Sequence, residues 1–272
     1  MELDLTKWAG EEQEVVFNPE DIFNECLINA EEELPKPPIA ISIGRKYEDD
    51  VPLVTYGNFA TIVGASKSMK SFLKSAILAC YIGGQAQNYF IDIKGHNSKG
   101  KYVIDIDTEQ GKYHVQKAIK RVHSMIGGKY EGYQGFALRP KTAKERVAFI
   151  EWILTKSKYA GSIGVLSIDG VADLVDDVND LKASNEITQK LMTWSNDYNI
   201  AILTVIHKNF GTEKATGHLG SAVLKKAESV IFVDKQDAIV TVSAKYTRNI
   251  PFDDFEFTVN EHGIPHETKQ NF

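Results

Sequence analysis

The feature that most constrains this fold is the alternation of two kinds of apolar segment through the middle of the chain. NFATIVG (58–64), IGVLSID (163–169) and IAILTVIH (200–207) are short, rich in β-branched residues and typical of buried strands. Segments with apolar residues at helical spacing, such as 71–84 and 185–198, lie between these predicted strands. This order predicts βαβ units, and therefore a mainly parallel sheet with helices on both faces.

The rest of the main region extends the same α/β pattern. Further strands are predicted at 88–93 and 101–107, and further helices at 112–126 and from a capping box at Thr142 to about residue 159. Three predicted strands then follow one another with few residues between them, at 229–234, 238–246 and 255–260. They indicate an antiparallel C-terminal extension of the sheet. The segment 36–57 is interpreted as a lead-in.

Composition excludes several other classes of protein. The chain has 272 residues, of which 43% are hydrophobic and 25% charged, as in ordinary globular domains. It contains no apolar run of about 18 residues, so no membrane span is expected. The acidic start does not resemble a secretory signal. The cysteines Cys26 and Cys80 are too few for a metal or disulfide framework, so a reducing, cytoplasmic location is expected.

Charge divides the chain unevenly. Residues 1–35 hold 11 acidic residues and one lysine, a balance of −10, which leaves −6 − (−10) = +4 for residues 36–272. The prolines of PKPP follow this segment and interrupt regular structure. We therefore expect an acidic N-terminal appendage (1–35), with a short helix near 19–33, before the main domain (36–272). Within that domain, 110–146 carries nine Lys/Arg against two Glu, which suits either a solvated face or a polyanion partner.

A candidate phosphate loop lies between the first predicted strand and the helix that follows it. Its residues are Gly64, Ala65, Ser66, Lys67, Ser68, Met69, Lys70 and Ser71. The segment fits the nucleotide-binding pattern G-x-x-x-x-G-K-[ST] except that Met69 replaces the second glycine. In such loops the backbone N–H groups surround phosphate oxygens, the lysine reaches the β- and γ-phosphates, and the hydroxyl holds Mg²⁺. Lys70 and Ser71 take these roles, and ATP and Mg²⁺ are the expected cofactors.

Three polar residues follow or end the later predicted strands. Glu109 comes just after 101–107, where a carboxylate can polarise an attacking water. Asp169 ends its apolar strand, which is the arrangement that holds Mg²⁺ directly or through water. His207 ends the strand 200–207 and is a candidate sensor of the γ-phosphate. The alternatives are a loop acid, a turn or cap aspartate and a structural histidine.

At this point the chain resembles the RecA-like ATPases, specifically the RepA/DnaB-type branch of hexameric helicases. The resemblance rests on four blocks in the same order: VGASKSMKS, YVIDIDTEQ, VLSIDGVADL and ILTVIHKNFGTEKATGHLGSAVLKKAESVIFVDK. It implies a RecA-like P-loop NTPase core in which Glu109 is the catalytic glutamate, Asp169 the magnesium-associated aspartate and His207 the sensor. A mobile loop then leads into a helix that contains Gly220 and Ser221. The style of the blocks also resembles ATPases carried by bacterial mobile elements, phages and plasmids.

The resemblance also implies a site completed by a neighbouring subunit. Relatives of this kind carry a lysine and an arginine close together after a late strand, and Lys245 and Arg248 stand at the corresponding place. A homo-oligomer, such as a hexamer, is therefore expected. Because their spacing of three puts the two cations on opposite faces of a straight strand, we expect the strand to end near Lys245. The alternative is that both are solvated cations that protect an edge strand.

One departure from the family concerns contact with DNA. In these helicases the loops after the magnesium-associated and sensor strands hold the nucleic acid. Here the first of these loops, within 170–186, carries five acids and one lysine, so it repels phosphate. The second, from Lys208 to Lys214, is more suitable, because Asn209 and two lysines accompany the flexible Gly211.

These observations lead to two main hypotheses of function. The first is an oligomeric ATPase that acts on single-stranded DNA in replication, mobilisation or recombination, with a replication or mobilisation protein bound through 1–35. The second is a nucleotide-switched assembly or loading protein with little turnover and no translocation. A P-loop kinase of a small substrate is a third reading, which the scarcity of arginine disfavours. Stimulation of the ATPase rate by single-stranded DNA separates the first two.

Overall fold

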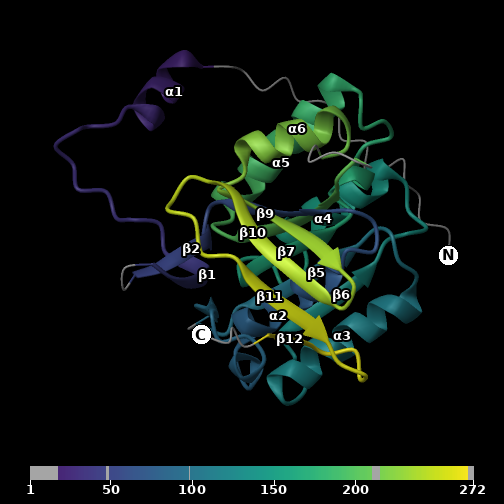
Figure 1. Ribbon diagram of the computed structural model, residues 1–272. Helices are drawn as coiled ribbons and strands as arrows, with labels where there is room; N and C mark the ends of the chain where they lie inside the picture. The colour runs from purple at the N-terminus through teal and green to yellow at the C-terminus, as the bar shows by residue number, and fades with distance from the viewer. Residues whose placement is uncertain (1–17, 47–48, 98, 210–214, 269–272) are drawn as a thin grey trace. The chain divides into compact units, whose positions relative to one another are not determined.

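The computed structural model describes residues 18–46, 49–97, 99–209 and 215–268 (Figure 1). Contacts divide the chain into two units, 1–36 and 37–272, which are described separately. In the first unit, α1 (Pro19–Cys26) begins after Asn18, whose side chain accepts a hydrogen bond from the N–H of Glu20 at 3.2 Å. Proline at the first helical position suits this start, because its missing N–H has no partner to lose there. The helix is shorter than the predicted 19–33.

The second unit is built on a large, mostly parallel sheet. Among the described residues, nine strands pair in the order β12-β11-β10-β9-β3-β8-β7-β5-β6. The strands from β9 to β6 pair in parallel, and β10, β11 and β12 add an antiparallel extension. The bounds are β3 (Phe59–Gly64), β5 (Tyr102–Asp107), β6 (Tyr133–Ala137), β7 (Ile163–Asp169), β8 (Ala201–His207), β9 (Ser229–Gln236), β10 (Ile239–Thr247), β11 (Phe255–Val259) and β12 (Pro265–Glu267). The predicted α/β class and C-terminal extension are confirmed.

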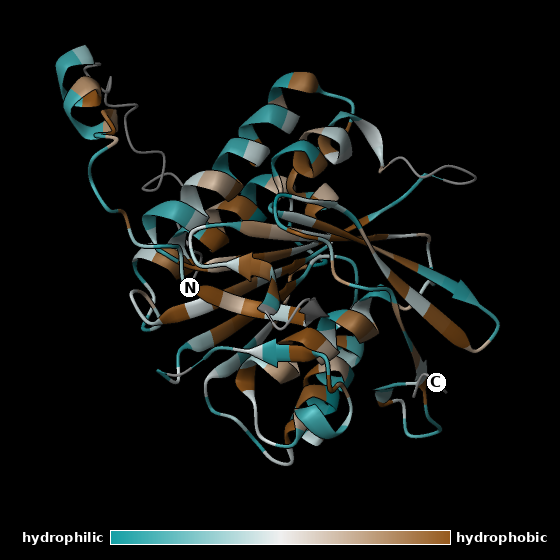
Figure 2. Ribbon diagram, turned by 60° about the vertical axis from the view of Figure 1, so that its left-hand side comes forward, coloured by the Kyte–Doolittle hydropathy of each residue, from teal (hydrophilic) through white to brown (hydrophobic). Residues whose placement is uncertain are grey.

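Helices cover both faces of this sheet, which is apolar along its strands (Figure 2). They are α2 (Lys70–Ile82), α3 (Lys112–Ile126), α4 (Ala143–Thr155), α5 (Leu181–Asp197) and α6 (Gly217–Lys226). Alternate residues of β3 divide between two cores: Ala60 and Ile62 pack with α2 and α3, whereas Phe59 and Val63 pack with α4, α5 and α6. A strand buried on both faces explains the uninterrupted apolar run 58–64. No helix in the described ranges is long and apolar enough to cross a membrane.

A second, smaller sheet lies in the segment that the sequence interprets as a lead-in. Its strands, β1 (Ile39–Lys46), β2 (Asp49–Thr55) and β4 (Ile93–Gly95), pair antiparallel in the order β2-β1-β4. The predicted strand at 88–93 is wrong. A 3₁₀ helix (Ala86–Asn88) stands at its start, and only Ile93 belongs to a strand. Strand β6 was not predicted either, because Gly135 interrupts a run of only five residues.

Parallel pairing aligns the ends of the strands that carry polar residues. Gly64 pairs with His207, and Asp107 pairs with Asp169. The carboxyl ends of β3, β8, β7 and β5 therefore meet at one edge of the sheet, where α/β sheets bind ligands. Strand β10 runs in the opposite direction, since Thr247 pairs with Ser229 at the start of β9. Its end therefore lies at the other edge of the sheet.

Candidate functional site

The segment Gly64–Ser71 forms a tight loop between β3 and α2. Met69 occupies the N-cap position of α2 with φ +71°, and Lys67 has φ +63°. Left-handed backbone of this kind costs an ordinary residue about 1–2 kcal/mol, which is why glycine is usual there. Met69 offsets part of that cost because its side chain packs against the core beneath the loop. The loop thus adopts the bend that glycine normally provides, with methionine in its place.

The loop presents hydrogen-bond donors that have no acceptor among the residues that the structure describes. No side chain in the described region caps α2, and the first N–H groups of a helix have no intrahelical acceptor. The hydroxyl of Ser68 is buried and lacks a hydrogen-bond partner among the described residues. A Cβ atom on Gly64 would lie 2.5 Å from this Ser68 Oγ, so only glycine fits there. Unpaired donors at a helix N-terminus suit an anion.

The ammonium group of Lys70 lies inside this loop. Its Nζ donates to the carbonyl oxygens of Gly64 at 3.0 Å and Ala65 at 2.7 Å, and lies 3.1 Å from His207 Nδ1. Burial lowers the pKa of Lys70, while Asp169 and Glu109 oppose that shift. These three partners can engage all three N–H bonds of the ammonium group, so the lysine is held at the loop.

His207 connects Lys70 to Glu109. Its Nε2 lies 3.0 Å from Glu109 Oε1 and 3.2 Å from Oε2. An ammonium group can only donate, so Nδ1 accepts from Lys70 and Nε2–H donates to the carboxylate. This assigns the tautomer of a neutral His207 and fixes the carboxylate of Glu109 at the rim of the cleft. The three predicted residues are brought together as one hydrogen-bonded series.

Ser71 and Asp169 meet on the other side of the loop. The Ser71 hydroxyl donates to Asp169 Oδ2 at 2.8 Å, which leaves its lone pairs available to a cation. Asp169 also pairs with Lys74, whose ammonium lies 3.1 Å from the same Oδ2. The predicted neighbourhood of hydroxyl and carboxylate is therefore present. No group of three or more His, Cys, Asp or Glu side chains in the described region forms a metal cage.

Lys74 is a site residue that the sequence analysis missed. It is fully buried and bridges Asp169 to Asp105, at 3.0 Å, while Tyr133 donates to Asp105 at 2.8 Å. Burial alone lowers the pKa of Lys74, but the negative charges of Asp105, Asp169 and Asp107 more than offset this effect. The pKa is therefore raised overall, and the ammonium group stays charged. Burial also raises the pKa of Asp107, whose carboxylate accepts the N–H groups of two residues that follow β5. The available signal was a lysine in the middle of an apolar helix.

One cleft joins the loop to the polar residues at the ends of the strands. It has a volume of about 460 Å³ and is lined by the loop, by Glu109, Asp169 and His207, and by the basic face of α3. That face contributes His114, Lys117 and Arg121, at helical spacing, from the basic stretch 110–146. Arg121 lies over the ring of Phe72 at 3.8 Å and donates to Ser75 Oγ at 3.1 Å. The cleft is therefore positive on two sides, with Glu109 at its rim.

The loops at this edge are tied together by Arg146. Its guanidinium donates to the carbonyl oxygens of Asp173 at 2.7 Å and Leu138 at 3.3 Å, which follow β7 and β6. It also reaches the carbonyl of Thr108, next to Glu109, at 3.4 Å. A single planar cation thus fixes three loops, and this also places Glu109.

Lys245 and Arg248 are not part of this cleft. Strand β10 continues to Thr247 and does not end near Lys245 as expected, although its pairing with β9 shifts register between Ala244 and Tyr246. Arg248 donates to the carbonyl of Lys226 at 2.9 Å, at the edge of the sheet opposite the phosphate loop. Within one chain these cations do not complete the site.

Several acids after Asp169 have local structural roles. Asp180 caps α5 by accepting the N–H of Lys182 at 2.8 Å, Asp177 accepts the N–H of Asn179, and Asp173 accepts the Thr108 hydroxyl.

Gly211 and Lys214 of the predicted sensor loop lie outside the described residues, as do residues 1–17 of the appendage. Gly220 and Ser221 lie on α6, in agreement with the predicted helix.

No protein-family model matches the chain, and no curated protein matches it significantly.

Proposed function

We propose that this protein binds ATP with Mg²⁺ and hydrolyses it, as a RecA-like P-loop ATPase. The observation that carries the proposal is the single cleft that gathers Lys70, Ser71, Asp169, His207 and Glu109. These side chains come from four segments far apart in the sequence. Each one supplies a different element of phosphoryl transfer: a cation, a metal-binding hydroxyl, a carboxylate behind it, a sensor and a base.

The residues present fit the proposed ligands. The unpaired Ser68 hydroxyl and the uncapped start of α2 suit phosphate oxygens. Ser71 and Asp169 suit Mg²⁺, which takes oxygen ligands and keeps several waters when only one or two protein groups bind it. When bound, the nucleotide would supply the phosphoryl group, and Mg²⁺ would neutralise the charge that develops on it during transfer.

The chain's own residues then have distinct tasks. Lys70 exchanges a carbonyl partner, Gly64 or Ala65, for a phosphate oxygen and keeps its charge close to the loop. Glu109 accepts a proton from an attacking water, because its carboxylate stands at the open rim of the cleft. His207 holds that carboxylate through Nε2–H, so a change at Lys70 is transmitted to Glu109.

Two features support action as an oligomer on nucleic acid. Arg248 lies away from its own cleft, so a neighbouring copy is the partner to which it can supply a cation. The basic face of α3 offers phosphate contacts near the cleft. On this proposal the protein serves DNA replication, mobilisation or recombination.

A second candidate is a nucleotide-switched assembly or loading protein with little turnover. The observation that favours it is the exposed acidic surface after β7, where Asp176, Asp177 and Asp180 repel a nucleic-acid backbone. The ATPase rate measured with and without single-stranded DNA separates the two candidates. Strong stimulation supports the first, and slow turnover that ignores DNA supports the second.

The test of the shared proposal is Lys70→Ala, with Lys144→Ala on the exposed face of α4 as the matched control. We expect Lys70→Ala to lose tight binding of a fluorescent ATP analogue, while circular dichroism shows an unchanged fold. Lys144→Ala should bind as the wild type does. A folded Lys70→Ala protein with wild-type affinity would refute the phosphate-loop assignment.

A further inference from the structure

A buried carboxylate holds the turn that carries Glu109. Asp107 is the last residue of β5, is 2% exposed and does not line the cleft. Its Oδ1 accepts the N–H groups of Glu109 at 3.0 Å and Gln110 at 2.7 Å. Its Oδ2 accepts the side-chain amide of Gln110 at 2.9 Å. Three donors from the turn therefore converge on one carboxylate.

The peptide group between Thr108 and Glu109 is held at both ends. Its N–H donates to Asp107, and its carbonyl oxygen accepts from Arg146 Nη2 at 3.4 Å. Thr108 is also tied to β7, since its N–H and its hydroxyl each donate to the carbonyl oxygen of Asp169 at 3.0 Å. A carboxylate at the N–H and a guanidinium at the carbonyl fix the orientation of this peptide. They thereby fix the direction in which the Glu109 side chain leaves the main chain.

The side chain of Glu109 needs this support. It is 39% exposed, and among the described residues its carboxylate bonds to a single neighbour, His207. A contact at the tip alone does not fix a long, flexible side chain whose main chain is free to turn. A reacting group that lies about 1 Å from its proper place can lose about 10² in rate. Glu109 is held at its tip by His207 and at its base by Asp107.

A carboxylate is an unfavourable group to bury at this place. Burial raises the pKa of Asp107, the charge of Lys74 lowers it, and the charge of Asp169 raises it again. A neutral asparagine could accept the same two backbone N–H groups without a buried charge. Hydrogen bonds to an ionised acceptor are about twice as strong as neutral ones. The carboxylate therefore makes the turn firmer although its burial is unfavourable.

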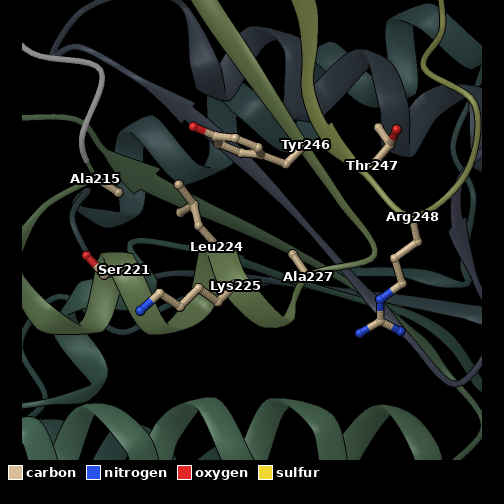
Figure 3. A pocket seen from close by; sticks show the side chains of 8 residues that line it. All are labelled: Ala215, Ser221, Leu224, Lys225, Ala227, Tyr246, Thr247 and Arg248. Carbon is tan, nitrogen blue, oxygen red and sulfur yellow. The ribbon is translucent and has the colours of Figure 1, made fainter.

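We propose that Asp107 is a positioning residue for the proposed hydrolysis, which holds the main chain of Glu109 so that His207 can hold its carboxylate. The inference rests on the proposed function, because it requires Glu109 to act on an attacking water. Asp107 acts through Glu109 and not on the nucleotide. The tie forms within each copy, since Arg248, the cation proposed to act on a neighbour, borders a separate pocket between α6 and the end of β10 (Figure 3).

The first experiment measures the tie itself, in the full chain without nucleotide. Asp107→Ala removes the acceptor of both N–H groups, whereas Asp107→Asn keeps an oxygen for them. Amide hydrogen exchange at Glu109 and Gln110 should be at least about ten-fold faster in Asp107→Ala and close to the wild type in Asp107→Asn. The matched control is Asp180→Ala, because Asp180 also accepts two backbone N–H groups, at the start of α5. Unchanged exchange in a folded Asp107→Ala protein would overturn the proposal.

The second experiment measures hydrolysis at saturating ATP and Mg²⁺. Turnover should fall by about 10- to 100-fold in Asp107→Ala, while the affinity for a fluorescent ATP analogue changes by less than about two-fold. Asp107→Asn should recover most of the turnover, and Asp180→Ala should keep all of it. In the Glu109→Gln background, Asp107→Ala should cause no further loss, because the two residues act as one unit. Should Asp107→Ala fail to fold, Asp107→Ser, which keeps one oxygen at shorter reach, takes its place in both experiments.

The outcomes separate this inference from the function on which it rests. Wild-type turnover by a folded Asp107→Ala or Asp107→Ser protein, when Glu109→Gln is inactive, would overturn the positioning role alone. A further loss when Asp107→Ala is added to Glu109→Gln would also overturn it, since Asp107 would then act elsewhere. Full turnover by Glu109→Gln, or a wild-type protein that does not hydrolyse ATP, would refute the proposed function and this inference with it.

Discussion

The imidazole of His207 lies 3.0 Å from the carboxylate of Glu109, although the two residues are 98 positions apart in the sequence. His207 ends β8 and Glu109 follows β5, and these two strands are not neighbours because β7 stands between them in the sheet. The contact therefore spans the carboxyl end of β7, the strand that ends at Asp169. The other ring nitrogen, Nδ1, lies 3.1 Å from Lys70 Nζ, so His207 connects Lys70 to Glu109.

We predict that Glu109→Gln keeps nucleotide binding and loses hydrolysis. The amide preserves the shape of the side chain and can still accept from His207, but it cannot take a proton from water. The turnover rate should fall by about 100-fold or more, with little change in affinity. Glu131→Gln, an exposed acid outside the cleft, is the control, and normal turnover by Glu109→Gln would return this residue to an ordinary loop acid.

Met69→Gly should be tolerated. Glycine removes the strain of the left-handed backbone but also loses the packing of the methionine side chain, so the free energy of unfolding should change by no more than about 1 kcal/mol. Nucleotide binding should remain and turnover should equal or exceed that of the wild type. Met69→Val is the informative comparison, because a β-branched residue fits this backbone poorly and should destabilise the protein in urea unfolding. Loss of binding in Met69→Gly would show that the methionine itself shapes the site.

Lys74→Met should strongly destabilise the fold. It leaves Asp105 and Asp169 buried without their cation, and breaking a buried pair in this way costs about 3–5 kcal/mol. Adding Asp105→Asn removes one of the stranded charges and should recover part of the loss in urea unfolding. If the single and double variants were equally unstable, packing would explain the effect better than charge.

Arg248→Ala should keep ATP affinity and lose hydrolysis, because the proposed role of this cation is exerted on the neighbouring copy. A cation of that kind contributes about 10³–10⁵ in rate in related enzymes. Mixing Arg248→Ala with Lys70→Ala should recover activity, since a hybrid boundary holds one intact loop and one intact arginine. Full activity of Arg248→Ala alone would exclude the role in trans.

Sequence reasoning placed the elements that are buried on both sides. The strands at 58–64, 163–169 and 200–207 are largely apolar runs because both of their faces are buried. Their buried polar residues include Thr61 and Thr204, whose hydroxyls bond to each other. The capping box at Thr142 marked the start of α4, because both of its hydrogen bonds are local. Elements of this kind are specified by neighbouring residues.

Other features depend on contacts that a linear pattern does not contain. Strands β1 and β2 pair with three shifts of register, and Gly44 interrupts the alternation of β1. The partners of Lys74 stand on strands far along the chain, so its burial could not be inferred from α2 alone. For the candidate phosphate loop the sequence predicted a strand, a loop and a helix, which the structure confirms. Whether methionine could take the place of glycine there depended on the energy of a left-handed backbone, which the pattern does not give.

The left-handed turn at Met69 has a consequence for how such loops are recognised. The second glycine of the usual motif supplies no side-chain chemistry; it allows the backbone to adopt a positive φ. Here Met69 adopts that left-handed conformation without glycine. On the proposed function, a criterion that requires this glycine would pass over the chain. One based on backbone angles, a lysine at the first helical turn and a following hydroxyl would retain it.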